Sequence, residues 1–177
     1  MHWLTPLFVL ALLASSALRL WLSERQAAAV ARHRAAVPVP FAQSVSAAEH
    51  AKAADYTTAK VRLGRISTLV DAALVLWLTL GGGIAALDAL WRETALPQPW
   101  LGAAVIASVA LILEAVSLPF SIWRTFGLEA RFGFNRTTPA LFVIDHLKGL
   151  ALAVLIGGPL LIATLLLMQH AGNWWWL

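Results

Sequence analysis

The sequence predicts an all-α fold: a bundle of four membrane-crossing helices with one further helix on the cytoplasmic side. Hydrophobic residues make up 60% of the 177 residues and charged residues only 12%, about half the charge of a typical soluble domain. Four apolar stretches are long enough to cross a hydrocarbon core of about 30 Å, which takes roughly 20 helical residues. Because lipid offers no water to backbone groups, each stretch must bond to itself as a helix.

The predicted crossings belong to one domain, residues 1–177, and span 3–22, 66–90, 100–123 and 147–168. The first also fits a signal peptide, since Ser15-Ser16-Ala17 offers a cleavage pattern. A signal peptide normally has basic residues before its apolar run, and none precedes this one, so we expect a retained helix. Gly81-Gly82-Gly83 lies inside the second crossing, where small residues would allow close helix contact.

Residues 23–65 form a predicted cytoplasmic arm. Pro38 and Pro40 favour an extended chain in the middle of this arm. Ser46 followed by Glu49 three residues later predicts a capping box. We therefore expect an amphipathic helix from residue 47 that runs into the second crossing, continuously or with a bend at Gly64.

Three signals describe the second half of the chain. Pro119 predicts a kink in the third crossing, which should stay helical past Trp123. Thr138 and Pro139 predict the N-cap and first residue of the next helix. Gly157-Gly158-Pro159 is expected to bend that helix halfway across the membrane.

The distribution of charge predicts the orientation in the bilayer. Residues 23–65 hold seven Lys and Arg against three acids, and the connection before the last crossing holds Arg124, Arg131 and Arg136. Basic loops stay in the cytoplasm, so the N-terminus faces out and residues 23–65 and 124–146 face in. The net charge of +4 is explained by topology, and we expect no nucleic-acid partner.

The residues present predict neither a catalytic centre nor a metal site. The chain has no cysteine, and none of its five histidines pairs with another at the four-residue spacing that a helical zinc protease needs. Two carboxylates, Asp71 and Glu114, lie within predicted crossings, where charge is costly. They fit either a structural pair with an arginine or backbone donor, or the wall of a hydrated cavity.

The segment "GLEARFGFNRTTPALFVIDHLKG", residues 127–149, resembles the N-terminal transmembrane domain of the type I CAAX prenyl protease family, which are membrane zinc metalloproteases. Its core is Phe-Gly-Phe-Asn followed by a threonine-rich turn. The segments "AADYTTAKVRLG", "ISTLVDAALVLW" and "SLPFSIWRTF" also match, so the likeness runs from about Leu18 to the end.

The resemblance implies a parent protein that hydrolyses peptide bonds with zinc-activated water, and a bacterial inner membrane as its location. The family's zinc-holding His-Glu-x-x-His is absent here, so these residues are expected to be either an N-terminal domain or a protein without its catalytic half. Its implied partners are the lipid bilayer, a C-terminal metalloprotease domain and membrane-associated or prenylated substrates. Zinc is implied for the full-length protein only. The alternative is a non-enzymatic scaffold or channel-like subunit.

Two further roles follow from the resemblance. Asp71 and Glu114 would face a water-filled intramembrane chamber. The segment 128–142 would form a rigid inner-face corner against which the protease domain docks, or else a stable turn without a docking role. The candidate corner residues are Glu129, Arg131, Phe132, Gly133, Phe134, Asn135, Arg136, Thr138 and Asp145.

Overall fold

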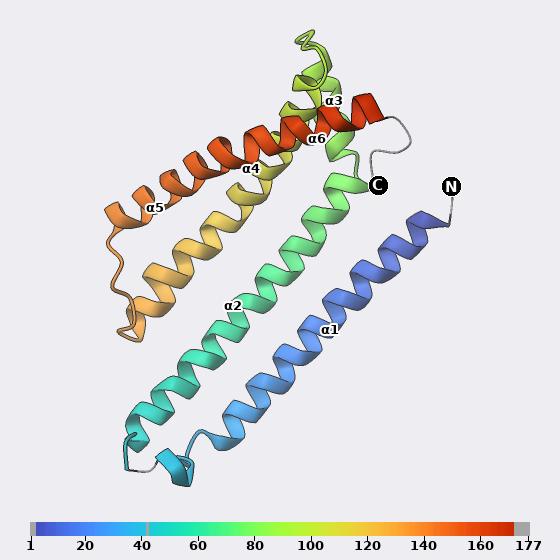
Figure 1. Cartoon of the computed structure of the whole chain (residues 1–177). Coiled ribbons are helices and arrows are strands. Elements are labelled where there is room, and N and C mark those ends of the chain that lie inside the picture. Colours follow the sequence, from blue (N-terminus) through green and yellow to red (C-terminus); the bar gives the residue numbers. More distant parts are fainter. Residues whose placement is uncertain (1–2, 42, 172–177) are drawn as a thin grey trace. The chain divides into compact units, whose positions relative to one another are not determined.

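The computed structural model describes residues 3–41 and 43–171, and this part of the chain consists of helices and the connections between them, without strands (Figure 1). The long helices are α1 (Leu4–His33), α2 (Ala47–Thr79), α3 (Gly83–Arg92), α4 (Trp100–Ile122), α5 (Pro139–Leu152) and α6 (Gly158–Ala171). A short 3₁₀ turn, η1 (Val39–Phe41), follows α1, and two π-helical segments are η2 (Trp123–Glu129) and η3 (Ala153–Gly157). The chain divides into two compact units, one of residues 1–76 and 116–136 and the other of 77–115 and 137–177.

Three helical stretches are long and apolar enough to cross a membrane: Leu4–His33, Trp100–Glu129 and Pro139–Ala171. The pair α2 and α3 adds a fourth if its bent halves count as one span. The described residues therefore confirm an all-helical membrane domain with three or four candidate spans. The arrangement of four crossings plus an amphipathic helix stays a prediction.

The second predicted crossing is not one continuous helix, so the prediction for the glycine triplet was wrong. α2 ends at Thr79, α3 starts at Gly83, and the two are bent by 50°. Gly82, at the N-cap of α3, has φ +81°, a left-handed conformation that residues with a Cβ adopt only at a cost. The triplet therefore breaks the helix, where we had expected it only to allow close packing inside one.

The arm is more helical than predicted at its start. α1 continues to His33 rather than ending near residue 22, so its 30 residues extend about 45 Å, beyond the hydrocarbon core. α2 begins with the predicted capping box: the Ser46 N–H donates to Glu49 Oε2 at 3.0 Å, and the Glu49 N–H donates to Ser46 Oγ at 3.2 Å. The helix then passes through Gly64 without a break.

Polar contacts join α1 to α2, which run antiparallel beside each other (Figure 1). Arg65 pairs with Glu24 at 2.7 Å. At the other end, the His50 Nε2–H donates to the His33 carbonyl oxygen at 2.9 Å. The two contacts join partners that are 41 and 17 positions apart in the chain, and together they hold α1 against α2.

The sequence signals in the second half of the chain can be compared with the helices that the structure shows there. Pro119 lies inside α4, and the helix continues past Trp123 as predicted, through the π-helical η2. Thr138 caps α5, its Oγ1 accepting from the Leu141 N–H at 3.2 Å, and Pro139 is the first helical residue. The π-helical η3 ends at Gly157, and α6 begins at Gly158. Together α5, η3 and α6 form one candidate span.

Very few of the described residues are buried: Ala54, Leu78, Gly83, Pro99, Leu101 and Leu128. None of the described polar or charged residues is buried. Large apolar side chains are exposed along all the candidate spans, as expected for helices whose apolar sides face lipid.

Candidate functional site

The corner after η2 is built by a glycine-centred helix C-cap. The Phe134 N–H donates to the Glu129 carbonyl oxygen at 2.8 Å, and the Gly133 N–H donates to the Ala130 carbonyl oxygen at 3.0 Å. This 6→1 and 5→2 pair is the Schellman motif, whose penultimate position is left-handed, and Gly133 has φ +72°. The Asn135 N–H also donates to the Glu129 carbonyl oxygen, at 3.2 Å. The predicted tight turn at Phe-Gly-Phe-Asn therefore has a defined backbone cause.

The two corner phenylalanines close on a tyrosine of the arm. Tyr56, on α2, meets the Phe132 ring edge-on at a centroid distance of 5.6 Å and the Phe134 ring at 5.0 Å. Edge-to-face pairs at these distances add about 0.5–1.5 kcal/mol beyond the burial of their area. Sequence reasoning placed Phe132 and Phe134 at the corner but missed Tyr56, the chain's single tyrosine.

Cations line the same contact. The Lys52 Nζ lies 5.3 Å from the Phe134 ring centroid, and the Arg131 guanidinium lies 5.8 Å from that of Phe132. A Cβ on Gly133 would meet Lys52 Nζ at 3.6 Å, an ordinary van der Waals distance, so the requirement for glycine comes from its φ angle rather than from lack of space.

An exposed ion pair ties the end of α1 to α2 beside this cluster. Arg34 Nε donates to Asp55 Oδ1 at 2.7 Å and Arg34 Nη2 to Asp55 Oδ2 at 2.8 Å, a bidentate geometry. Asp55 lies on the arm, before the second predicted crossing. The hydrogen bond from Arg34, helped by the charges of Arg34 and Arg131, holds the pKa of the Asp55 carboxyl below its usual value.

A groove of about 770 Å³ lies between α2 and the α4–η2 end within the same unit. Its lining combines basic and aromatic side chains, among them Arg62, Arg131, Phe120, Trp123 and Phe132. Such a surface suits a partner segment that carries acidic or apolar side chains. The corner and the groove share Arg131 and Phe132, so they form one surface.

Three other predicted residues, Asp71, Arg136 and Asp145, do not line the groove. Asp71 is exposed on α2, and Ser67 Oγ donates to its Oδ2 at 3.3 Å. Arg136 is exposed within the corner segment 128–142, and Asp145 is exposed on α5.

The structure brings Glu114 to a partner that sequence reasoning did not pair with it. His146 Nε2, on α5, lies 4.0 Å from Glu114 Oε1, on α4. The His146 Nδ1–H donates to the Phe142 carbonyl oxygen at 2.8 Å, and the ring stacks on Phe142 at a centroid distance of 4.1 Å. These contacts aim Nε2 at the carboxylate. The pairing joins residues 32 positions apart, so no local spacing reveals it.

In the described part of the chain, no group of three or more His, Cys, Asp or Glu residues lies close enough together to hold a metal ion. The whole sequence also contains no His-Glu-x-x-His.

Comparison with known proteins identifies the domain. The family model described as "CAAX prenyl protease N-terminal, five membrane helices" matches residues 26–177. The chain belongs to this family. The match favours a membrane domain of this family over the alternative that the sequence left open, a scaffold or channel-like subunit. The family's description has five membrane helices, against the three or four candidate spans of the described residues.

Curated relatives of the chain have names of the CAAX prenyl protease 1 type. The chain is 39% identical over 69 residues to the CAAX prenyl protease 1 homolog of Oryza sativa subsp. japonica, covering 39% of this chain and 16% of that protein. It is 50% identical over 46 residues to CAAX prenyl protease 1 of Saccharomyces cerevisiae, covering 26% and 10%. It is 27% identical over 155 residues to the probable CAAX prenyl protease 1 of Schizosaccharomyces pombe, covering 77% and 31%.

A solved structure shares the fold. The crystal structure of S. mikatae Ste24p matches with a TM-score of 0.82 at 22% identity, over 95% of this chain and 40% of that one. The chain thus spans from a tenth to two fifths of the length of the proteins it matches.

Proposed function

We propose that these residues are the membrane-embedded N-terminal part of a zinc metalloendopeptidase, whose zinc and catalytic residues lie in a C-terminal metalloprotease domain. The observation that carries the proposal is the family match over residues 26–177. Its substrates would be membrane-associated or prenylated proteins or peptides, the class that the relatives' names suggest. The domain itself supplies placement and enclosure rather than bond cleavage.

One observation on the source gene tests this directly. The reading frame is expected to continue past Leu177 into a helix with His-Glu-x-x-His, and the full-length protein is expected to bind zinc and cleave a prenylated C-terminal peptide. Residues 1–177 expressed alone are expected to show no cleavage. A frame without that motif, or cleavage by these residues alone, would contradict the proposal.

The second part of the proposal is that Glu114 and Asp71 face a hydrated chamber inside the membrane. Exposed carboxylates within candidate spans support it, because an ionised group facing lipid is costly. The chain has no cysteine, so single-cysteine variants can be labelled cleanly. Glu114→Cys in the full-length protein should react with a small water-soluble thiol reagent, whereas Leu113→Cys, at the same depth, should not. Equal rates at both positions would refute the chamber-facing role.

The third part is that the corner is the docking surface for the protease domain. A backbone held by a Schellman motif and by Tyr56 is rigid, and its exposed arginines give it a positive charge that suits an acidic partner. Arg136→Glu in the full-length protein should lower peptidase activity several-fold without lowering the thermal midpoint of residues 1–177. Lys60→Glu, an exposed lysine of the arm with the same charge change, serves as the control. Equal activity in both variants would leave the corner a turn without a docking role.

Finally, we propose that the N-terminus faces out and that residues 23–65 and 124–146 are cytoplasmic. The excess of Lys and Arg in these two segments supports this orientation. A bacterial inner membrane is the proposed location, although the relatives named above come from a plant and from yeasts.

A further inference from the structure

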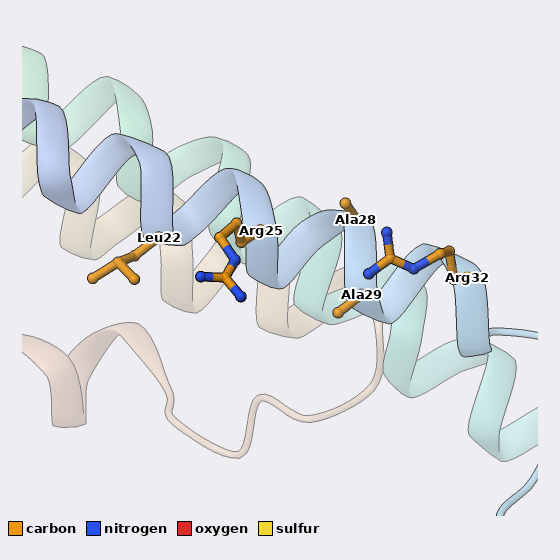
Figure 2. Close-up of a pocket in the computed structure, with 5 residues that line it drawn as sticks. All are labelled: Leu22, Arg25, Ala28, Ala29 and Arg32. Atoms are coloured by element: carbon orange, nitrogen blue, oxygen red, sulfur yellow. The ribbon is translucent and has the colours of Figure 1, made fainter.

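The water-side end of α1 carries a small basic hollow. It has a volume of about 480 Å³ and is lined by Leu22, Arg25, Ala28, Ala29 and Arg32 (Figure 2). Figure 2 shows the two arginines spaced along one helix with the alanines between them. We propose that this hollow binds the phosphate-bearing headgroup of an anionic phospholipid.

The position along α1 places the hollow at headgroup depth. The apolar part of the helix ends near Leu22, and α1 runs eleven residues further, to His33. Trp21, which is exposed, stands at this boundary, and indole rings favour the headgroup level. Arg25 therefore lies about one turn beyond the hydrocarbon edge, within the headgroup layer, and Arg32 lies about three turns beyond that edge, on the water side of the layer.

The two arginines keep their charge available. Neither forms an ion pair within the described residues. The nearby acids of this region have other partners: Glu24 is paired with Arg65 of α2, and Asp55 is paired with Arg34. The Arg25 guanidinium sits 4.7 Å over the Trp21 ring centroid, a stacking that leaves its N–H edges open. Guanidinium edges bind phosphate oxygens in a bidentate fashion.

The spacing gives the hollow its shape. Arg25 and Arg32 are seven residues apart, so they lie on one face of the helix, about 10 Å apart along its axis. The residues between them on that face are alanines, which leave room for a headgroup, and Leu22 extends the surface toward the acyl chains. Charge, room and an apolar floor thus meet where the hollow enters the layer in which anionic lipids present their phosphates, and Arg32 adds positive charge on the water side of that layer.

The test uses residues 1–177, purified in detergent, delipidated and titrated with phosphatidylglycerol or phosphatidylcholine while native mass spectrometry counts bound lipids. The wild type should bind phosphatidylglycerol in preference to phosphatidylcholine. Arg25→Gln with Arg32→Gln should weaken phosphatidylglycerol binding about thirtyfold, since each basic residue near a membrane contributes roughly a fivefold gain. Lys60→Gln with Arg124→Gln removes the same charge elsewhere and should change binding less than threefold, because neither residue lines the hollow.

A second pair of variants tests the hollow apart from its charges. Ala29→Leu fills the hollow and should weaken binding of the anionic lipid, whereas Ala31→Leu, exposed but outside the lining, should not. Circular dichroism checks that all four proteins keep their helices. Equal binding by the Arg25/Arg32 variant and its control, equal affinity of the wild type for both lipids, or equal effects of the two leucines would each overturn the proposal. This inference does not depend on the proposed protease activity.

Discussion

Gly133 is the residue on which the backbone of the corner depends. Its φ of +72° lies where a Cβ costs about 1–2 kcal/mol. Gly133→Ala should therefore lower the free energy of unfolding of residues 1–177 by about that amount, measured by denaturation in detergent. Gly149→Ala is the matched control, since Gly149 lies within α5 with nothing near its Cβ position, and it should not destabilise the protein.

An equal loss of stability in both variants would show that the left-handed cap is not what holds the corner.

The Asp55–Arg34 pair predicts a pH dependence at the same scale. Because the pKa of folded Asp55 lies below its ordinary value of 3.8, the pair stabilises the folded state fully above that value. The contribution is then lost as the pH falls through the lower, folded pKa. The difference in thermal midpoint between wild type and Asp55→Asn should be small, since the pair is exposed, and should narrow as the pH falls below the ordinary value of 3.8.

A difference that stays constant over this range, or widens toward acid, would contradict the role assigned to the ion pair.

At the scale of elements, the boundary signals read directly from the sequence were the most reliable. The capping box at Ser46 and Glu49 and the Thr138–Pro139 start both appear as predicted, because each depends on hydrogen bonds between residues close in the chain. The glycine triplet was misinterpreted because glycine occurs both where helices pack closely and where a helix breaks. Only its φ angle distinguishes the two cases.

The site divides in the same way. The corner's turn residues were predicted, since a C-cap is local. Tyr56 and His146 were not predicted, because their partners are distant in the sequence. Phe132 lies 76 positions from Tyr56, and Glu114 lies 32 positions from His146. Contacts of this kind depend on how helices pack, which one sequence does not reveal.

The break between α2 and α3 makes its own prediction. Gly82→Ala should destabilise the protein by about 1–2 kcal/mol, because the left-handed N-cap of α3 disfavours a Cβ. Gly64→Ala, inside the continuous part of α2 with open space at its Cβ position, should instead raise stability by up to about 1 kcal/mol. Thermal unfolding in detergent measures both, and the same sign of change in both variants would contradict the assignment of the break.

At the scale of the whole molecule, the orientation can be measured in intact cells. Gln98 lies in the exposed connection between α3 and α4, and Ser44 lies in the arm. Gln98→Cys should react with a membrane-impermeant thiol reagent added from outside, and Ser44→Cys should react only after the cells are opened. The reverse pattern would invert the proposed topology.

The central claim is that these residues form the membrane part of a protease whose metal lies elsewhere in the protein. The most direct measurement is the zinc content of purified residues 1–177 in detergent, after gel filtration without chelator. The account predicts less than about a tenth of a zinc ion per chain, because the cluster of ligands that tight binding needs is missing from the described residues. One tightly held zinc ion per chain would contradict it.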